Sequence, residues 1–337
     1  MASRDAPSAS SQVVVITGGS AGIGRATAQA FARRGARVAV LARGQQRLDD
    51  TCREIEQLGG QALGLPTDVA DEAQVEAAAA EVERRWGGID VWVNNAMATI
   101  FAPVEQIGAD DFRRATEVTY LGAVWGTQAA LKRMTARNRG VIVQVGSALA
   151  YRSIPLQAPY CAAKAALRGF TDSLRSELIH DGSGVRLTMV QLSAFNTPQF
   201  DWGRTTLPCR PQPVPPIFQP ELAGEAIVWA ATHARRESWV GWPAVKAILA
   251  QRLVPELLDR LLAVRGYGGQ QGDEPLPAGR ADNLFEPAPG QQGSHGRFDE
   301  RSTPSSRQWW LATHRWVPVL AVIALIAAGG VALAWSR

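Results

Sequence analysis

The sequence predicts an α/β protein built on a doubly wound parallel sheet, and two observations support that prediction. Short, β-branched apolar runs recur within residues 12–265, at 13–18, 38–43, 90–96, 140–147 and 185–192. Longer helix-like windows lie between them, at 22–34, 72–86, 110–137 and 159–180. Apolar strands that alternate with helices are typical of a parallel sheet covered on both faces. We therefore expect a single domain over residues 12–265.

The composition is that of a folded globular chain, with 46% hydrophobic and 20% charged residues among 337. The formal charge of +4 comes without a basic run, so we expect no nucleic-acid partner. Cys52, Cys161 and Cys209 are widely spaced, and we expect neither a disulfide framework nor a metal site. Only three of the 35 basic residues are lysines, at positions 132, 164 and 246.

The two ends of the chain differ in composition from this domain. Residues 1–11 contain no apolar stretch of signal-peptide length, and we expect them to be disordered. Residues 266–308 are rich in Gly, Pro, Gln and paired charges, with few large aliphatic side chains. Because such a segment buries little apolar area to offset its ordering entropy, the composition predicts a flexible linker.

Residues 309–337 are predicted to form an anchor region, because residues 317–335 contain no charge. At about 1.5 Å per residue this helix would measure ~28 Å, close to the ~30 Å hydrocarbon core of a bilayer. Tryptophans flank it as interfacial anchors would, at 309, 310 and 316 on one side and 335 on the other. Arg301, Arg307, His314 and Arg315 precede it, which places the main domain on the cytoplasmic side. The alternative is a buried C-terminal helix that packs an oligomer.

A glycine-rich turn, TGGSAGIG at 17–24, joins the first strand to the first helix. Gly18 would permit the tight turn, Gly22 the close approach of a pyrophosphate, and Gly24 the packing of the helix on the strand. The helix N-terminus would supply N–H donors and positive dipole to a phosphate. This strand–turn–helix context favours a dinucleotide site over a simple glycine loop.

At this point the chain resembles the short-chain dehydrogenase/reductase family. The resemblance covers about residues 12–265 and rests on several motifs in register: Asp68 after the third strand, Asn94-Asn95-Ala96 after the fourth, Ser147 at the end of the fifth, and Tyr160-x-x-x-Lys164. It implies a Rossmann-like fold and NAD(P)-dependent oxidoreductase activity. The candidate cofactor-binding residues are Thr17, Gly18, Ser20, Gly22, Ile23, Gly24, Arg43, Asp68, Asn95, Tyr160, Lys164 and Thr197.

The end of the second strand predicts the choice of cofactor. A carboxylate there would bind the ribose 2′-hydroxyl of NAD, but this chain has Ala42-Arg43. A guanidinium suits a 2′-phosphate, so NADP(H) is favoured and NAD(H) stays possible. Arg43 could instead be an ordinary solvated residue.

Ser147, Tyr160 and Lys164 are the candidate catalytic residues. Tyr160 and Lys164 are four apart, so they lie on one helix face, and an ammonium beside the phenol favours its ionised form. The resemblance implies that Tyr160 exchanges the proton with the substrate oxygen, that Ser147 hydrogen-bonds that oxygen, and that Lys164 binds the nicotinamide ribose. The alternative is an ordinary tyrosine and a solvated lysine, which the scarcity of lysine disfavours.

Three positions depart from the family pattern. Met97 replaces the glycine that usually follows Asn-Asn-Ala. Thr119 stands where the family has an asparagine that completes a proton relay, and we include it as a catalytic candidate. Leu192-Ser193 replaces the usual Pro-Gly after the sixth strand. These departures put the rate and the cofactor geometry in doubt more than the fold.

The resemblance implies that the loop after the sixth strand, here Phe195 to about Pro220, determines substrate choice. This loop contains Phe195, Phe200, Trp202, Ile217 and Phe218 together with many prolines, and it predicts a hydrophobic ketone, aldehyde or alcohol as substrate, unless these side chains only pack the loop or a second subunit. The resemblance implies a homo-oligomer. A membrane-tethered NADP(H)-binding scaffold or sensor is the alternative function. An epimerase or dehydratase is disfavoured, since those relatives have a differently spaced glycine turn and a larger C-terminal domain.

Overall fold

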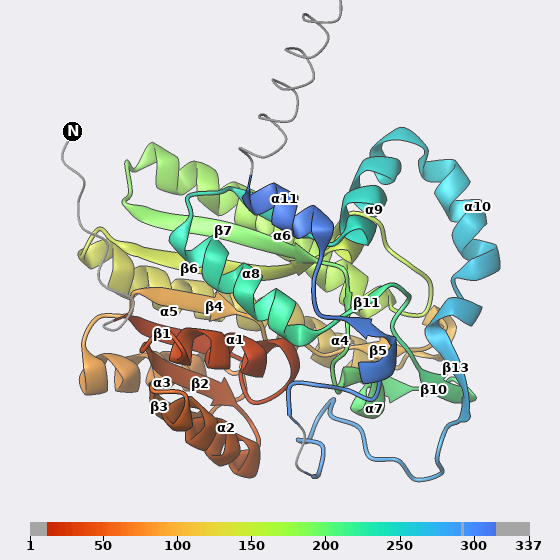
Figure 1. The fold of residues 1–337 in the computed structure, drawn as a ribbon, viewed down its shortest axis with the longest axis horizontal. Helices are drawn as coiled ribbons and strands as arrows, with labels where there is room; N and C mark the ends of the chain where they lie inside the picture. Colours follow the sequence, from red (N-terminus) through yellow and green to blue (C-terminus); the bar gives the residue numbers. More distant parts are fainter. Residues whose placement is uncertain (1–11, 291–292, 315–337) are drawn as a thin grey trace, which may run out of the picture.

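The computed structural model describes residues 12–290 and 293–314. Its centre is a seven-stranded parallel sheet in the order β12-β7-β6-β4-β1-β2-β3 (Figure 1). The strands are β1 (Val13–Thr17), β2 (Arg37–Ala42), β3 (Gln61–Pro66), β4 (Val91–Asn94), β6 (Gly140–Ser147), β7 (Val185–Leu192) and β12 (Glu237–Val240). The strand order reverses between β1 and β4, and such a switch point opens a crevice at the carboxyl ends of the strands. The predicted doubly wound parallel sheet is confirmed.

Helices cover both faces of this sheet, and β1 shows why its sequence is apolar at every position. Val14 and Ile16 belong to the buried cluster on one face, and Val13 and Val15 to the cluster on the other. The first face is covered by α1 (Gly22–Ala32), α2 (Gln45–Gln57) and α8 (Pro220–Thr232), and the second by α3 (Glu72–Trp86), α5 (Gly122–Ala136) and α6 (Ala158–His180).

The helix predicted over 110–137 is interrupted. It consists of α4 (Ala109–Thr116), a π-helical turn over Glu117–Leu121, and α5. π-helical turns occur frequently at functional sites. This one is joined to the loop after β4, because the backbone N–H of Ala98 donates to the hydroxyl of Thr119.

Smaller elements gather beyond the carboxyl ends of the strands. α9 (Trp242–Leu253) and α10 (Pro255–Arg265) project from the body (Figure 1). Short strand pairs tie the loops together; their members are β5 (Ile100–Phe101) with β9 (Arg204–Thr205), β8 (Ala194–Phe195) with β11 (Ile217–Phe218), and β10 (Cys209–Pro211) with β13 (Gln271–Pro275). α7 (Gln199–Trp202) is a single turn within the loop that follows β8.

Residues 266–290 and 293–306, which we call the strap, lie against the domain, so the prediction of a flexible linker over 266–308 is wrong. β13 pairs with β10, and β14 (Ser302–Thr303) extends the sheet of β11. Leu284 and Phe298 are 0% and 4% exposed. A few apolar anchors replace the continuous apolar pattern, together with arginine hydrogen bonds to backbone carbonyls between the strap and the domain. Average composition does not reveal contacts of that kind.

The predicted anchor region is described only in part. α11 (Arg307–Thr313) follows the strap, and Trp309 packs edge-on against Trp229 of α8 at 5.4 Å between ring centroids. The prediction that Trp309 is an interfacial anchor is therefore wrong, because this side chain belongs to the buried core. No helix within 12–290 and 293–314 is long and apolar enough to span a bilayer. The predicted transmembrane segment 317–335, Trp316, Trp335 and the predicted disordered residues 1–11 lie outside the described residues.

Candidate active site

The glycine turn between β1 and α1 forms a cradle that side chains would fill. Gly18 and Gly22 have φ of +64° and +54°, the left-handed region that favours glycine. A Cβ added to Gly24 would lie 2.2 Å from the carbonyl oxygen of Gly18. Among the described residues no side chain caps the N-terminus of α1, so N–H groups of its first turn can meet a phosphate.

Asn95 and Thr17 fasten the loop after β4 to the glycine turn. The Asn95 Nδ2 donates to the carbonyl oxygens of Thr17 and Gly18, at 3.0 and 3.1 Å. The Thr17 hydroxyl oxygen accepts from the backbone N–H groups of Asn95 and Ala96. These bonds bring together two loops that are nearly eighty residues apart in sequence, and they fix one wall of the groove at the switch point.

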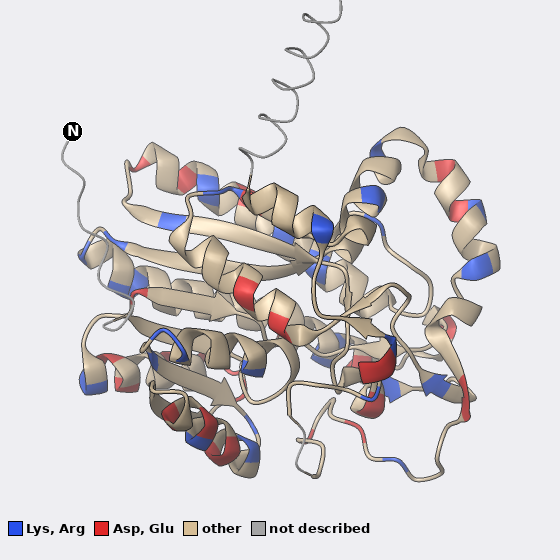
Figure 2. Cartoon of the chain, in the orientation of Figure 1, with Lys and Arg blue, Asp and Glu red and all other residues tan. Residues whose placement is uncertain are grey.

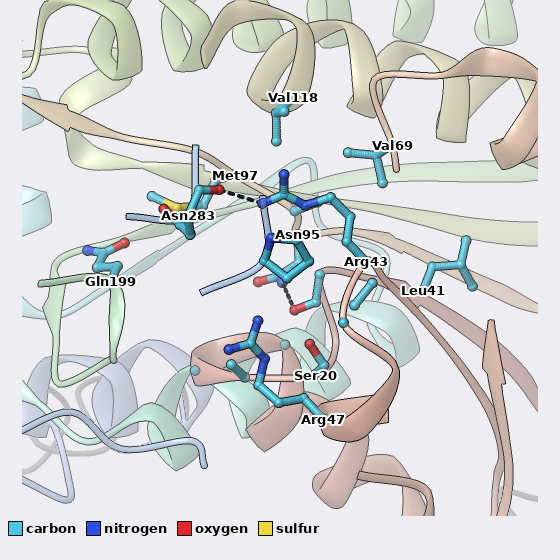
Figure 3. Close-up of a pocket in the computed structure, with 18 of the residues that line it drawn as sticks. Ser20, Leu41, Arg43, Arg47, Val69, Asn95, Met97, Val118, Gln199 and Asn283 are labelled. Carbon is cyan, nitrogen blue, oxygen red and sulfur yellow. Dashed lines mark hydrogen bonds between the residues drawn. The ribbon is translucent and has the colours of Figure 1, made fainter. Parts of the chain in front are cut away.

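Arg43 points into this groove, at the end of β2 (Figure 3). Its guanidinium donates to three strap carbonyls, those of Asn283, Leu284 and Phe285. Burial lowers the pKa of Arg43, and the neighbouring Arg114 lowers it further. The guanidinium is therefore a partly desolvated donor held between the groove and the strap. The alternative that Arg43 is an ordinary solvated residue does not fit these contacts.

The strap also covers the groove at two further points. Arg47 donates to the carbonyl oxygen of Ala288 at 2.7 Å, and the Gly22 N–H donates to that of Gly293 at 3.2 Å. Asn283 and Pro287 belong to the groove lining, with Ser20, Ile23, Asp68 and Thr197 among the predicted residues. Nothing in the sequence motifs indicates the strap; the apolar pair Leu284-Phe285 within a polar stretch is a signal that could have done so.

Asp68 lies at the end of the groove where Arg43 is found. Its carboxylate pairs with Arg114 of α4 at 2.5 Å and accepts from the backbone N–H of Ala70 at 3.1 Å. Arg114 also donates to the carbonyl oxygen of Leu284. The acidic residue is therefore held in place by α4, and α4 is joined to the strap.

Ser147, Tyr160 and Lys164 come together at the carboxyl end of β6. All three line one cavity of about 360 Å³. Ser147 ends β6, while Tyr160 and Lys164 lie one turn apart near the start of α6. The Lys164 Nζ donates to the carbonyl oxygen of Val145 at 2.6 Å and lies 5.7 Å from the Tyr160 ring centroid. The predicted common face of these two side chains is present.

Burial dominates the proton equilibria of this pair. It raises the pKa of Tyr160 to about 12, against which hydrogen bonding from Ser147 acts. It lowers the pKa of Lys164 to about 8, and this side chain is 3% exposed. Both shifts follow from the cost of holding a charge away from water. The sequence predicts an ionised phenol from the attraction between ammonium and phenolate, but burial outweighs that attraction here.

Thr119 does not reach this cavity. Its hydroxyl accepts from the backbone N–H of Ala98 at 2.9 Å and donates to the Ala98 carbonyl oxygen at 3.1 Å. The side chain is fully buried within the π-helical turn. Thr119 therefore holds the loop after β4 in place, and a direct contact with Lys164 or substrate stays a prediction without geometric support.

The cofactor groove and the cavity of Tyr160 adjoin each other. Five residues line both: Ile23, Asn95, Met97, Thr197 and Gln199. Met97, which replaces the family glycine, therefore stands at the junction. Ser193, which replaces another glycine, donates to the carbonyl oxygen of Val240 at 2.7 Å and accepts from the N–H of Ala244. This substitution ties the end of β7 to the start of α9.

The predicted substrate loop contributes only part of the cavity wall. Phe195 and Phe200 line the cavity, whereas Trp202 lines the cofactor groove beneath Arg47. Ile217 and Phe218 form buried β11. A further part of the wall, which the sequence motifs do not indicate, comes from α9 and α10 through Pro243, Ala247, Leu261, Leu262 and Arg265. Apolar spacing at 257, 258, 261 and 262 is a signal that could have found it.

A family model described as short chain dehydrogenase matches residues 12–205, more than half of the chain. This chain belongs to the short-chain dehydrogenase/reductase family. The uncharacterized oxidoreductase YxnA of Bacillus subtilis is 32% identical over 316 residues, which cover 93% of this chain and 88% of that protein. The chain is accordingly an oxidoreductase with the NAD(P)-binding fold of the family.

Solved structures of the family superpose on the domain. An alcohol dehydrogenase from the archaeon Thermococcus sibiricus, complexed with 5-hydroxy-NADP, is 28% identical with a TM-score of 0.59, and the match covers 68% of this chain and 95% of that one. A metagenomic short-chain oxidoreductase in complex with NADP is 28% identical with a TM-score of 0.58, and covers 69% and 96%. YxnA matches over a longer part of this chain than either structure does.

Proposed function

We propose that this short-chain dehydrogenase/reductase uses NADP(H) to interconvert a carbonyl compound and an alcohol, with Tyr160 as general acid and base. The observation that supports the proposal is the junction of the two cavities, where Asn95 and Thr197 line both. A substrate bound beside Tyr160 would lie next to the nicotinamide end of a dinucleotide in the groove.

The residues of the groove fit a dinucleotide. The uncapped start of α1 offers N–H donors, and the Gly18–Gly24 contact leaves no room for a Cβ against the turn. Arg43 and Arg47 face the groove where a 2′-phosphate would lie, which favours NADP(H) over NAD(H). When bound, NADPH would supply the hydride that the carbonyl carbon gains in reduction, and NADP+ would accept the hydride that the alcohol carbon loses in oxidation.

Tyr160 and Ser147 would act on the substrate oxygen. With a pKa of about 12, the Tyr160 phenol holds its proton at neutral pH, which suits donation to a carbonyl oxygen during reduction. The Ser147 hydroxyl, on the same cavity wall, would stabilise the negative charge that develops on that oxygen. Lys164 would stabilise the phenolate left behind, because its ammonium lies near the ring.

The cavity favours a hydrophobic substrate. Phe195, Phe200, Leu261 and Leu262 contribute to its wall, while α9 and α10 present exposed apolar side chains outside it. Leu253 and Val264 are about four-fifths exposed. Apolar pockets exclude polar ligands because the hydration of those ligands is lost without replacement. We propose a lipophilic ketone, aldehyde or alcohol.

Membrane attachment through residues 317–335 is part of the same proposal, with the catalytic domain on the cytoplasmic side. Its support is the uncharged run of bilayer-spanning length in the sequence. The full-length chain should then sediment with membranes and resist extraction at alkaline pH. Recovery in the soluble fraction without detergent would contradict it. A homo-oligomer is expected from the family and is tested by light scattering in detergent.

Activity is tested by NADPH and NADH oxidation against a panel of carbonyl compounds that ranges from polar sugars to long-chain ketones. We expect turnover with NADPH on the hydrophobic members. Tyr160→Phe should lower turnover by roughly 10²–10⁴-fold, the range for loss of a general acid, with NADPH affinity within twofold. Substantial activity of the variant would remove Tyr160 from the mechanism. NADPH binding without any turnover would favour the scaffold or sensor.

The cofactor preference has its own test in Arg43→Gln. We expect the KM for NADPH to rise roughly tenfold, the effect of one lost charge-assisted hydrogen bond, with little change for NADH. A wild-type enzyme that prefers NADH would overturn the assignment.

A further inference from the structure

A second cavity, of about 500 Å³, lies at the end of the sheet opposite the active site. β12 pairs only with residues 189–192 of β7, so residues 185–188 of β7 have no strand beside them on that side within the described chain. The cavity occupies this open sheet edge. Its other walls are the carboxyl end of α6, and the end of α8 with the loop that leads to β12.

Its lining is strongly basic. Arg175, Arg186, Arg235 and Arg236 all face it, and no Asp or Glu belongs to the lining. Asp172, outside the lining, pairs with Arg175 and Arg236. Glu237, also outside the lining, adds a second negative charge near Arg175. Figure 2 shows the corresponding blue segments at the end of α6, on β7 and in the loop before β12.

Arg186 enters the cavity wall from β7. Its Nη2 donates to the carbonyl oxygen of Ala231 at 2.8 Å, and it forms no ion pair within the described residues. Burial alone lowers its pKa. A partly desolvated guanidinium without an acidic neighbour is a strong donor to an anion, because its bidentate geometry and charge are both available.

Thr188 provides a second and independent indication of a ligand. Its side chain lies one β-repeat from Arg186 on the same face of β7 and lines the cavity. It is 2% exposed, and its hydroxyl has no hydrogen-bond partner among the described residues. Buried hydroxyl groups nearly always have a partner, so a ligand oxygen is the natural one here.

We propose that this cavity binds the phosphate group of an organic phosphate ester. Guanidinium forks match phosphate oxygens, and a hydroxyl adds one more donor. The volume exceeds that of a phosphate alone, and Leu178 and Ile179 give the cavity an apolar side, so the ester has an apolar portion. The site lies about 20 Å from the active-site end of β7, at roughly 3.3 Å per residue over 186–192, and it does not depend on the proposed reaction.

The cavity also lies beside α11, because Arg235 donates to the carbonyl oxygen of Ala312 at 2.8 Å. The chain leads from α11 toward the uncharged run at 317–335. The phosphate could therefore come from an acidic lipid headgroup or from a soluble ester, and the two sources share the same chemistry.

The test is calorimetric titration of the full-length chain in nonionic detergent, with NADPH at saturation so that the cofactor groove is blocked. The probes are dihexanoyl phosphatidic acid, glycerol 3-phosphate, and dihexanoyl phosphatidylcholine as a zwitterionic reference. We expect phosphatidic acid to bind, and Arg186→Gln to weaken its binding roughly tenfold or more, as for a lost charged hydrogen bond. Arg85→Gln, an exposed arginine on α3, is the matched control and should stay within twofold.

Thr188→Val keeps the side-chain shape without the hydroxyl and should weaken binding severalfold. NADPH affinity, measured in parallel, shows that each variant is folded. Binding of phosphatidic acid alone supports a lipid source, and equal binding of glycerol 3-phosphate supports a soluble ester. Binding of neither probe at millimolar concentration, or unchanged binding by both cavity variants, would overturn the proposal, whatever the outcome of the carbonyl panel.

Discussion

Replacement of Lys164 by methionine tests the burial of the ammonium directly. Lys164 is 3% exposed, and its pKa falls from the usual 10.5 to about 8 because burial disfavours the charged form. At about 1.4 kcal/mol per pKa unit, this difference corresponds to ~3 kcal/mol. At pH 7 the lysine is charged in both the folded and the unfolded chain, so the folded state bears the whole of this cost.

The sign of the pH dependence follows from proton binding. Between pH 8 and pH 10.5 the unfolded chain binds more protons at this lysine than the folded chain does, so wild-type stability rises with pH through that window. The Lys164→Met variant lacks this titrating group, so its stability does not gain this increase with pH. Its stability relative to wild type should therefore fall by ~3 kcal/mol between pH 7 and pH 10.5. The lost hydrogen bond to Val145 adds an offset that does not change this trend.

The assay is thermal unfolding of both proteins in the same detergent across pH 7–10.5. For a chain of this size about 1 kcal/mol corresponds to roughly 2–4 °C in Tm, so the difference in Tm should change by roughly 6–12 °C. Lys246→Met, at an exposed lysine, is the matched control and should show a nearly constant difference. A constant Tm difference for Lys164→Met, or one that grows in its favour with pH, would refute the reasoning.

Two further predictions concern the cofactor groove. Gly24→Ala should abolish detectable NADPH binding in fluorescence titration, because its Cβ would lie 2.2 Å from a backbone carbonyl oxygen. Gly169→Ala, with open space around the added Cβ, is the control and should bind NADPH normally. Normal binding by Gly24→Ala would contradict the description of the glycine turn as a cofactor cradle. Leu284→Ala should destabilise the strap by roughly 2–4 kcal/mol and speed both NADPH dissociation and hydrogen exchange of strap amides. Phe285→Ala, at a side chain that is 44% exposed, should have a much smaller effect on both. Identical exchange in the two variants would show that the strap is not held as described.

The periodic part of the fold could be predicted from the sequence because its signals are local. β1 is apolar at every position since alternate residues enter opposite cores, and the glycine turn follows it directly. The apolar pattern does not mark the strands at 61–66 and 237–240, since β3 is an edge strand with half-exposed residues and β12 spans only four. Only the family resemblance implies a strand before Asp68. The assignment of both strands depends on pairing with β2 and β7, which are distant in sequence.

The sequence by itself determined the parallel sheet, the glycine cradle and the common helix face of Tyr160 and Lys164, because these depend on local spacing. The place of Ser147 beside them is what the family resemblance implies. Only the tertiary structure decided that the strap covers the groove and that Trp309 is a core residue. It also decided that burial, more than the neighbouring charge, shifts the pKa of Tyr160. These properties arise from contacts between distant segments, whose energies depend on the surrounding solvent exclusion and leave no local pattern in the chain.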